Sequence, residues 1–161
     1  MKFNNTLTSL VVASSLFSAA AVADPITVYG KANISAQMTD DGDGSFSELK
    51  SNASRFGATG DMALDNGITV FYKVEWGVDF ADASDSDNIK SRDQYLGLKG
   101  EFGTVIVGRM NSSLKNLSKP VDVFNDYEGD IKGLGWKGEN RFSDSVSYFS
   151  PSLSGFTVEV N

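Results

Sequence analysis

Acidic side chains gather in a long polar stretch between two strand-like runs. This stretch extends from Gly108 to Asp130 and carries Asp122, Asp126, Glu128 and Asp130. A connection of this length between neighbouring strands is usually functional or disordered. The chain has no His and no Cys, so it lacks the usual general base, the commonest metal ligand and any thiolate. These absences exclude most hydrolase sites, Ser-His-Asp triads included. We therefore expect no enzymatic activity, no cofactor and no metal site.

Two other acidic stretches have simpler interpretations. Six aspartates in them are expected to be solvated loop residues, as most charge runs are: Asp40, Asp41, Asp43, Asp82, Asp85 and Asp87. The sequence D-D-G-D-G-S at 40–45 has a faint likeness to a calcium-binding loop. Its glycine falls in the wrong place for an EF-hand and no helical pattern flanks it, so a calcium site is not expected.

The first 23 residues predict a secretory signal peptide. Lys2 gives a positive start, Leu7 to Val22 is apolar and rich in small residues, and Ala21-Val22-Ala23 is a cleavage signal. The run is short for a membrane-spanning helix, which needs about 20 apolar residues. The mature chain would be 24–161, and losing Lys2 changes the net charge from −7 to −8. Nucleic acid is not an expected partner, because neutralising phosphates requires an excess of Lys and Arg.

Alternation of apolar and polar residues dominates the mature chain. From Ile26 to Met38 every second residue is apolar or small, and the residues between are mostly polar. This period of two indicates a strand with two different faces. Similar or weaker runs predict about seven strands and no helix after the signal peptide: 26–38, 51–62, 68–78, 91–100, 102–108, 140–149 and 156–160. On this pattern Lys31, Lys73 and Glu75 lie on polar faces.

Short and long links alternate between these runs. Asp65-Asn66-Gly67, Glu101-Phe102-Gly103 and 151–155 are short, and Asn-Gly suits a tight hairpin turn. The stretches 39–50, 79–90 and 108–130 are long. Ten-residue strands with short turns at one end and long loops at the other favour an antiparallel transmembrane β-barrel with up-and-down meander topology. A secreted β-sandwich, a binding or adhesion module whose acidic loops hold a ligand or cation, remains the alternative.

Four segments carry a likeness to a known family. They are V-Y-G-K (28–31), S-R-F-G-A-T-G (54–60), S-R-D-Q-Y-L-G-L-K-G-E-F-G-T-V-I-V-G-R-M-N-S-S (91–113) and E-N-R-F-S-D-S-V-S-Y-F-S-P-S-L-S-G-F (139–156). In this order they resemble parts of the Gram-negative general diffusion porins: the first strand, the second strand, the strand–turn–strand unit that ends at the third external loop, and the strand that follows this loop. That family closes sixteen strands in a chain roughly twice as long. We therefore expect 24–161 to be the N-terminal half of a porin barrel.

The resemblance implies a water-filled outer-membrane channel for passive diffusion of small hydrophilic solutes and ions. The stretch 110–138 corresponds to the third loop, which folds into the barrel and narrows it. Its acids, Asp122, Asp126, Glu128 and Asp130, would face wall arginines, and Arg55 and Arg109 match those arginines by motif. The resemblance places Arg92 and Arg141 in the lumen less firmly, beside Lys31, Lys73 and Glu75. It also implies export through the periplasm, contact with outer-membrane lipids and a homotrimer latched by 79–90.

Two departures from the family pattern suggest a mild preference for cations. Thr59 and Ser147 stand where the family has basic wall residues, which would weaken the positive side of the pore. Strict alternation also places Arg109 with Val105 and Val107 on the lipid face. We therefore predict a break at Gly108 that turns Arg109 inward. Tyr72 and Trp76 lie on an apolar face, which favours interfacial-belt residues over sugar-binding residues of the lumen.

Overall fold

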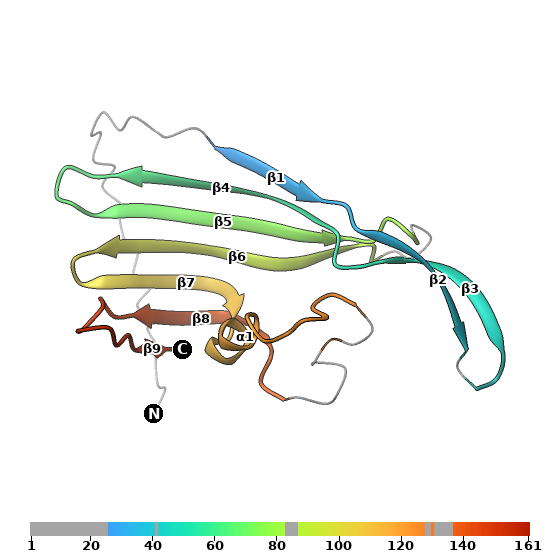
Figure 1. The fold of residues 1–161 in the computed structure, drawn as a ribbon. Coiled ribbons are helices and arrows are strands. Elements are labelled where there is room, and N and C mark those ends of the chain that lie inside the picture. The colour runs from blue at the N-terminus through green and yellow to red at the C-terminus, as the bar shows by residue number, and fades with distance from the viewer. Residues whose placement is uncertain (1–25, 41, 83–86, 128–129, 131–136) are drawn as a thin grey trace, which may run out of the picture.

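A computed structural model describes residues 26–40, 42–82, 87–127, 130 and 137–161. The predicted signal peptide, Asp41, Asp85 and Glu128 lie outside these residues. More than half of the described chain forms antiparallel strands (Figure 1). These strands are β1 Thr27–Lys31, β2 Ile34–Asp40, β3 Ser45–Ser51, β4 Arg55–Ala63, β5 Thr69–Val78, β6 Ile89–Gly100, β7 Gly103–Asn111, β8 Arg141–Phe149 and β9 Glu159–Val160.

A seven-stranded sheet contains all of these strands except two. Its order is β1-β4-β5-β6-β7-β8-β9, and β2 and β3 pair with each other as a separate hairpin. Since β2 continues β1 and β3 leads into β4, the hairpin extends these two neighbouring strands beyond the end of the seven-stranded sheet (Figure 1). The predicted up-and-down meander is confirmed, and the barrel is not closed by these strands.

The β2–β3 hairpin corrects one predicted loop. The stretch 39–50 was expected to be irregular, but Ser45–Ser51 pairs with Ile34–Asp40 residue by residue. The turn at its tip uses positive φ at Gly42 (94°) and Gly44 (148°), a backbone region open to glycine. Only the tip is therefore irregular, and the two glycines allow the acidic segment to reverse direction.

Short turns and long connections lie at opposite ends of the seven-stranded sheet, as predicted (Figure 1). The turns between β4 and β5 and between β6 and β7 are short. The connections after β5 and β7 start at the other end. The connection after β7 contains a short helix, α1 Ser113–Ser118. Alternation gave no sign of α1, because one and a half turns of helix are too short for a 3.6-residue pattern.

The two faces of the sheet differ in chemistry. The inner face carries Tyr29, Lys31, Arg55, Lys73 and Glu75, as the strand register and their mutual contacts show. The outer face carries large apolar side chains that remain exposed, including Val28, Phe56, Leu96, Val107 and Val146. On this face Phe56 and Trp76 stack with ring centroids 5.4 Å apart.

The β-sandwich alternative is not supported. A sandwich has a second sheet packed over an apolar core. Among the described residues Met110 is the one large apolar side chain that is buried. The apolar face of this sheet therefore has no protein layer over it in the described chain. None of the described helices is both long and apolar enough for a membrane crossing.

Candidate functional site

Glu75 is the centre of a charge cluster on the inner face. Its carboxylate is nearly buried and accepts hydrogen bonds from Arg92 Nε (2.6 Å) and Tyr29 Oη (2.8 Å). Lys73 Nζ lies 3.4 Å from the same group and Arg55 Nε lies 4.0 Å from it. Because burial of a carboxylate is costly without partners, these surrounding donors are what permit Glu75 to face inward.

Asp93 forms a second centre beside the first. It accepts hydrogen bonds from Lys73 Nζ (2.8 Å) and from Arg141 Nε on β8 (2.6 Å). A bulge between β5 and β6 makes this possible, because Val74 pairs with Gln94 but Trp76 pairs with Ser91. Two residues, Arg92 and Asp93, thus lie opposite Glu75, and both side chains point to the inner face. The ion pairs connect β5, β6 and β8.

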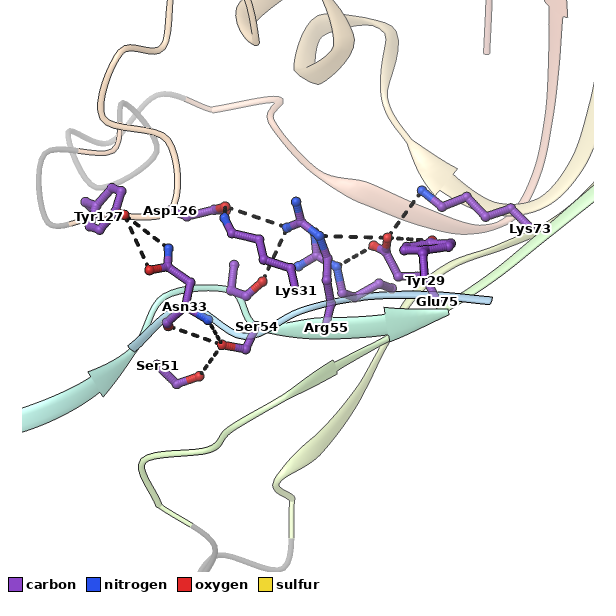
Figure 2. Close-up of polar contacts among 12 residues, drawn as sticks. Tyr29, Lys31, Asn33, Ser51, Ser54, Arg55, Lys73, Glu75, Asp126 and Tyr127 are labelled. Atoms are coloured by element: carbon purple, nitrogen blue, oxygen red, sulfur yellow. Dashed lines mark hydrogen bonds and ion pairs between the residues drawn. The ribbon is translucent and has the colours of Figure 1, made fainter. Parts of the chain in front are cut away.

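The tip of the long loop is tied to the opposite end of this cluster (Figure 2). Asp126 Oδ2 lies 3.1 Å from Lys31 Nζ on β1 and 3.6 Å from Arg55 on β4. Next to it, the Tyr127 hydroxyl accepts a hydrogen bond from Asn33 Nδ2 at 3.1 Å. A polar network therefore runs along the inner face from Asp126 through Glu75 and Asp93 to Arg141. We call it the charge ladder.

A polar cavity of about 260 Å³ lies between the charge ladder and the long loop. Asp122, Asp126 and Asp130 line it from the loop, and Arg55, Arg92 and Arg141 line it from the strands. The cavity lining holds six basic and six acidic side chains in all. Cations on the strands and carboxylates on the loop therefore line the same cavity.

The start of the loop contributes cations of its own. Lys115 Nζ on α1 lies 3.5 Å from Glu139, whose carboxylate is almost fully buried. Partial burial lowers the pKa of Lys119, just after α1, below its ordinary value, and nearby Lys73 and other cations add to the effect. Lys119 thus loses its charge at a lower pH than an ordinary lysine. Across the described residues, no cluster of His, Cys, Asp or Glu is arranged to hold a metal ion.

The prediction that Arg109 turns inward is wrong. The predicted break is present, because Gly108 has a φ of 129° and the β7–β8 register shifts between Gly108 and Met110. Pairing with β6 nevertheless continues through it, with Arg109 opposite Gln94. The Arg109 side chain lies in a shallow surface pocket with Ser91 and Ser143, outside the cavity. Met110, the next residue, takes the inward position.

Alternation and motifs correctly grouped Lys31, Arg55, Lys73, Glu75, Arg92 and Arg141 on one face. They missed Tyr29, Asn33, Asp93, Lys115 and Glu139. The signal for Tyr29, Asn33 and Asp93 was available, since all three alternate in phase with inner-face residues of their runs. Glu139 lies just before a strand, where alternation carries no information about the direction of a side chain.

The Tyr29 side chain crosses over Gly57 to reach Glu75. These residues form one row of the sheet, with Gly57 in the middle. A Cβ on Gly57 would lie 2.7 Å from Tyr29 Oη and 2.5 Å from Val74 O. The Tyr29 ring thus crosses the space that a side chain on Gly57 would fill.

Gly57→Ala should therefore destabilise the folded barrel by about 1–3 kcal/mol, the usual cost of overpacking. The urea midpoint of the full-length protein in lipid vesicles measures this effect. Gly30→Ala is the matched control, because its Cβ would meet nothing closer than 3.5 Å. Equal midpoints for the two variants would contradict the crossing of Tyr29 over Gly57.

Comparison with known proteins agrees with this geometry. The family model of Gram-negative porins matches residues 6–161. The major outer membrane protein P.IB of Neisseria gonorrhoeae is 32% identical over 155 residues, which cover 88% of this chain and 43% of that protein. The corresponding protein of Neisseria sicca is 29% identical over 151 residues, covering 86% and 42%. The chain thus spans less than half the length of these relatives.

A solved structure supports the fold. An anion-selective porin from Comamonas acidovorans aligns with a TM-score of 0.66 at 20% identity, over 83% of this chain and 44% of that one. The single meander sheet, its exposed apolar outer face and the match of the family model over nearly the whole sequence agree with one another. The chain therefore belongs to the Gram-negative porins, a family of outer-membrane β-barrel proteins.

Proposed function

We propose that the full-length protein forms a water-filled channel for passive diffusion of small hydrophilic solutes and ions across the outer membrane. The observation that carries this proposal is the charge ladder facing the acids of the long loop across a polar cavity. Charged groups that line an aqueous lumen select permeating ions by electrostatics. Arg55, Arg92 and Arg141 form the positive side of the constriction, and Asp122, Asp126 and Asp130 form its negative side, together with Glu128.

Export and assembly belong to the same proposal. Residues 1–23 direct the chain through the periplasm as a signal peptide, and the mature barrel assembles as a homotrimer. The connection 79–90 latches neighbouring subunits. Membrane association through the apolar outer face is consistent with this arrangement, because lipid tolerates strands only when a closed barrel satisfies their backbone groups. Heat-modifiable gel mobility of the full-length protein, together with its extraction in outer-membrane fractions, tests it.

The proposal also includes a preference of the channel for cations over anions. The mature net charge of −8 and the missing cation at Thr59 favour cations. The cavity lining is balanced, with six basic and six acidic side chains, so the preference should be small. Reversal potentials of the full-length protein in a planar bilayer under a salt gradient measure it. A reversal potential with the sign expected of an anion-selective channel would overturn the cation preference. It would not affect the proposal that the protein forms a channel.

Thr59→Lys should shift the reversal potential towards anions. Thr59 pairs with Thr27 on one side and Lys73 on the other, on the inner face. A lysine there adds a positive charge next to the charge ladder with no new carboxylate to pair it. Lys50→Thr, on the separate hairpin, serves as a control for a distant charge change. An unchanged reversal potential in Thr59→Lys would mean that this row of the sheet does not face the conducting path.

A further inference from the structure

A second cavity, of about 250 Å³, lies between the inner face of the sheet and the start of the long loop. The strands β5, β6, β7 and β8 supply its wall, and α1 and the residue after it border it from the loop. These four strands are neighbours in one continuous register, and α1 follows β7 at the loop end of the sheet (Figure 1). The cavity is therefore built from elements that the sheet holds in fixed positions.

One end of the second cavity is polar and carries an unpaired ammonium. Lys119 and Asn116 line this end from the loop, and Lys119 Nζ lies 3.4 Å from Asn116 Oδ1. Lys119 is exposed, so an entering solute can reach it. Among the described residues, no carboxylate forms an ion pair with Lys119. Asp93, the acidic member of the described lining, already pairs with Lys73 (2.8 Å) and Arg141 (2.6 Å).

The other end of the second cavity is apolar. Tyr95, Ile106 and Phe149 line it from three neighbouring strands, and all three side chains are partly exposed. The Tyr95 ring meets Phe71 edge to face, with centroids 6.3 Å apart, which fixes its orientation. Tyr95 pairs with a residue three positions before Asn111, so the two ends are about 10 Å apart along the strands. Side chains from both ends shorten this separation.

We propose that the second cavity binds solutes that carry a carboxylate on a small aromatic ring, with Lys119 contacting the carboxylate and Tyr95 and Phe149 contacting the ring. An ammonium and a carboxylate form charge-assisted hydrogen bonds, which are stronger than neutral ones. Aromatic rings attract one another in edge-to-face or offset-stacked arrangements. A cavity of about 250 Å³ is small for a ligand site, so it suits a single ring. The inference rests on the proposed channel, because the solute reaches the cavity through the lumen.

Binding of benzoate to the detergent-solubilised full-length protein tests the proposal, with dissociation constants measured by saturation-transfer difference NMR at neutral pH. Acetate lacks the ring, benzyl alcohol lacks the carboxylate, and benzylamine has the opposite charge. Benzoate should bind more tightly than all three. Lys119→Gln should weaken benzoate binding by about tenfold, the loss of one charged hydrogen bond, and leave benzyl alcohol binding unchanged. Phe149→Leu should weaken benzoate binding by about threefold to tenfold and leave acetate binding unchanged.

Matched variants outside the second cavity control for general effects. Lys50→Gln removes the same charge from the separate hairpin, and Phe102→Leu removes a ring from the turn between β6 and β7. Both should keep the wild-type affinity for benzoate. Equal affinities of wild type and Lys119→Gln for benzoate would overturn the proposal, as would equal affinities of the wild type for benzoate and acetate. Lys119 lies in the loop, so these two comparisons decide the outcome even if Phe149→Leu does not fold.

Ion current through the same proteins in planar bilayers distinguishes failure of this inference from failure of the proposed channel. Benzoate should reduce the single-channel current of the wild type in potassium chloride, and Lys119→Gln should need about tenfold more benzoate for the same reduction. Current through the channel without ring-dependent binding of benzoate would overturn the binding site and leave the channel in place. Ring-dependent binding without any current would overturn the channel and leave the binding site in place.

Discussion

Glu75→Gln should be the most damaging single substitution in the inner face of the full-length protein. We expect a loss of about 3 kcal/mol in the free energy of unfolding, the lower end of the ~3–5 kcal/mol that breaking a buried ion pair costs. The lower end applies because Arg55, Lys73 and Arg92 retain about a quarter of their side-chain exposure. Water can then solvate part of the charge that Glu75 no longer neutralises.

The loss of stability is expected because the Glu75 carboxylate interacts with several donors and cations at once. Glutamine keeps the shape and one acceptor oxygen, so Tyr29 or Arg92 can retain a hydrogen bond. The three neighbouring cations, however, lose their shared counter-charge and repel one another. The lumen also gains a net positive charge, so the reversal potential should move towards anions in the same variant.

Urea unfolding in lipid vesicles, followed by tryptophan fluorescence, measures the stability change. Glu48→Gln is the matched control, because it removes the same charge from the exposed β2–β3 hairpin, where Gln37 donates a hydrogen bond to it. Such surface changes usually stay within about 0.5 kcal/mol. The double variant Glu75→Gln/Arg92→Gln should recover part of the loss. Equal midpoints for Glu75→Gln and Glu48→Gln would contradict the central role of Glu75.

Alternation predicted the strands and much of the charge ladder because both depend on one local rule. Side chains two residues apart in a strand share a face, so Lys73 and Glu75 were placed together without knowledge of their partners. The same rule failed where the register changes. The bulge opposite Glu75 brings Arg92 and Asp93 to one face, and no residue in 91–94 marks it in the sequence.

Arg109 shows a different limit. The break at Gly108 was predicted correctly, but its effect on the direction of Arg109 was not. The bend affects pairing with β8 and leaves pairing with β6 intact, so Arg109 stays outside and Met110 turns inward. Which of two neighbouring strands absorbs a bulge depends on contacts with both. A single sequence contains no local record of that choice.

The docking of the loop tip was also beyond sequence reasoning. The resemblance placed Asp126 across the pore from Arg55, whereas the two side chains are in contact at 3.6 Å. The tip folds back to β1 and β4, the first strands of the same sheet, and so its position is fixed by residues about 70 to 95 positions away. Asp122 and Asp130 line the same cavity from the loop.

Asp126→Asn should release the loop tip. Asp126 has a φ of 76°, which Asn adopts readily, so the backbone should survive the change. The ion pairs with Lys31 and Arg55 are partly exposed, and each contributes up to about 1 kcal/mol. Losing both ion pairs lowers the free energy that favours the docked tip over the released tip by up to about 2 kcal/mol. The ratio of docked to released tip then falls by up to roughly 30-fold. Open-channel current noise of the full-length protein in planar bilayers should increase accordingly.

Tyr127→Phe distinguishes the effect of anchoring the loop tip from the effect of the charge that the tip carries. It removes the hydrogen bond from Asn33 without changing any charge, so current noise should increase while the reversal potential stays at the wild-type value. Asp126→Asn, in contrast, removes the carboxylate that Lys31 and Arg55 share, and should raise the noise and also move the reversal potential towards anions. If Asp126→Asn moved the reversal potential but left the noise unchanged, the tip would be held by contacts other than these. The loop would then act on permeating ions through its charge alone.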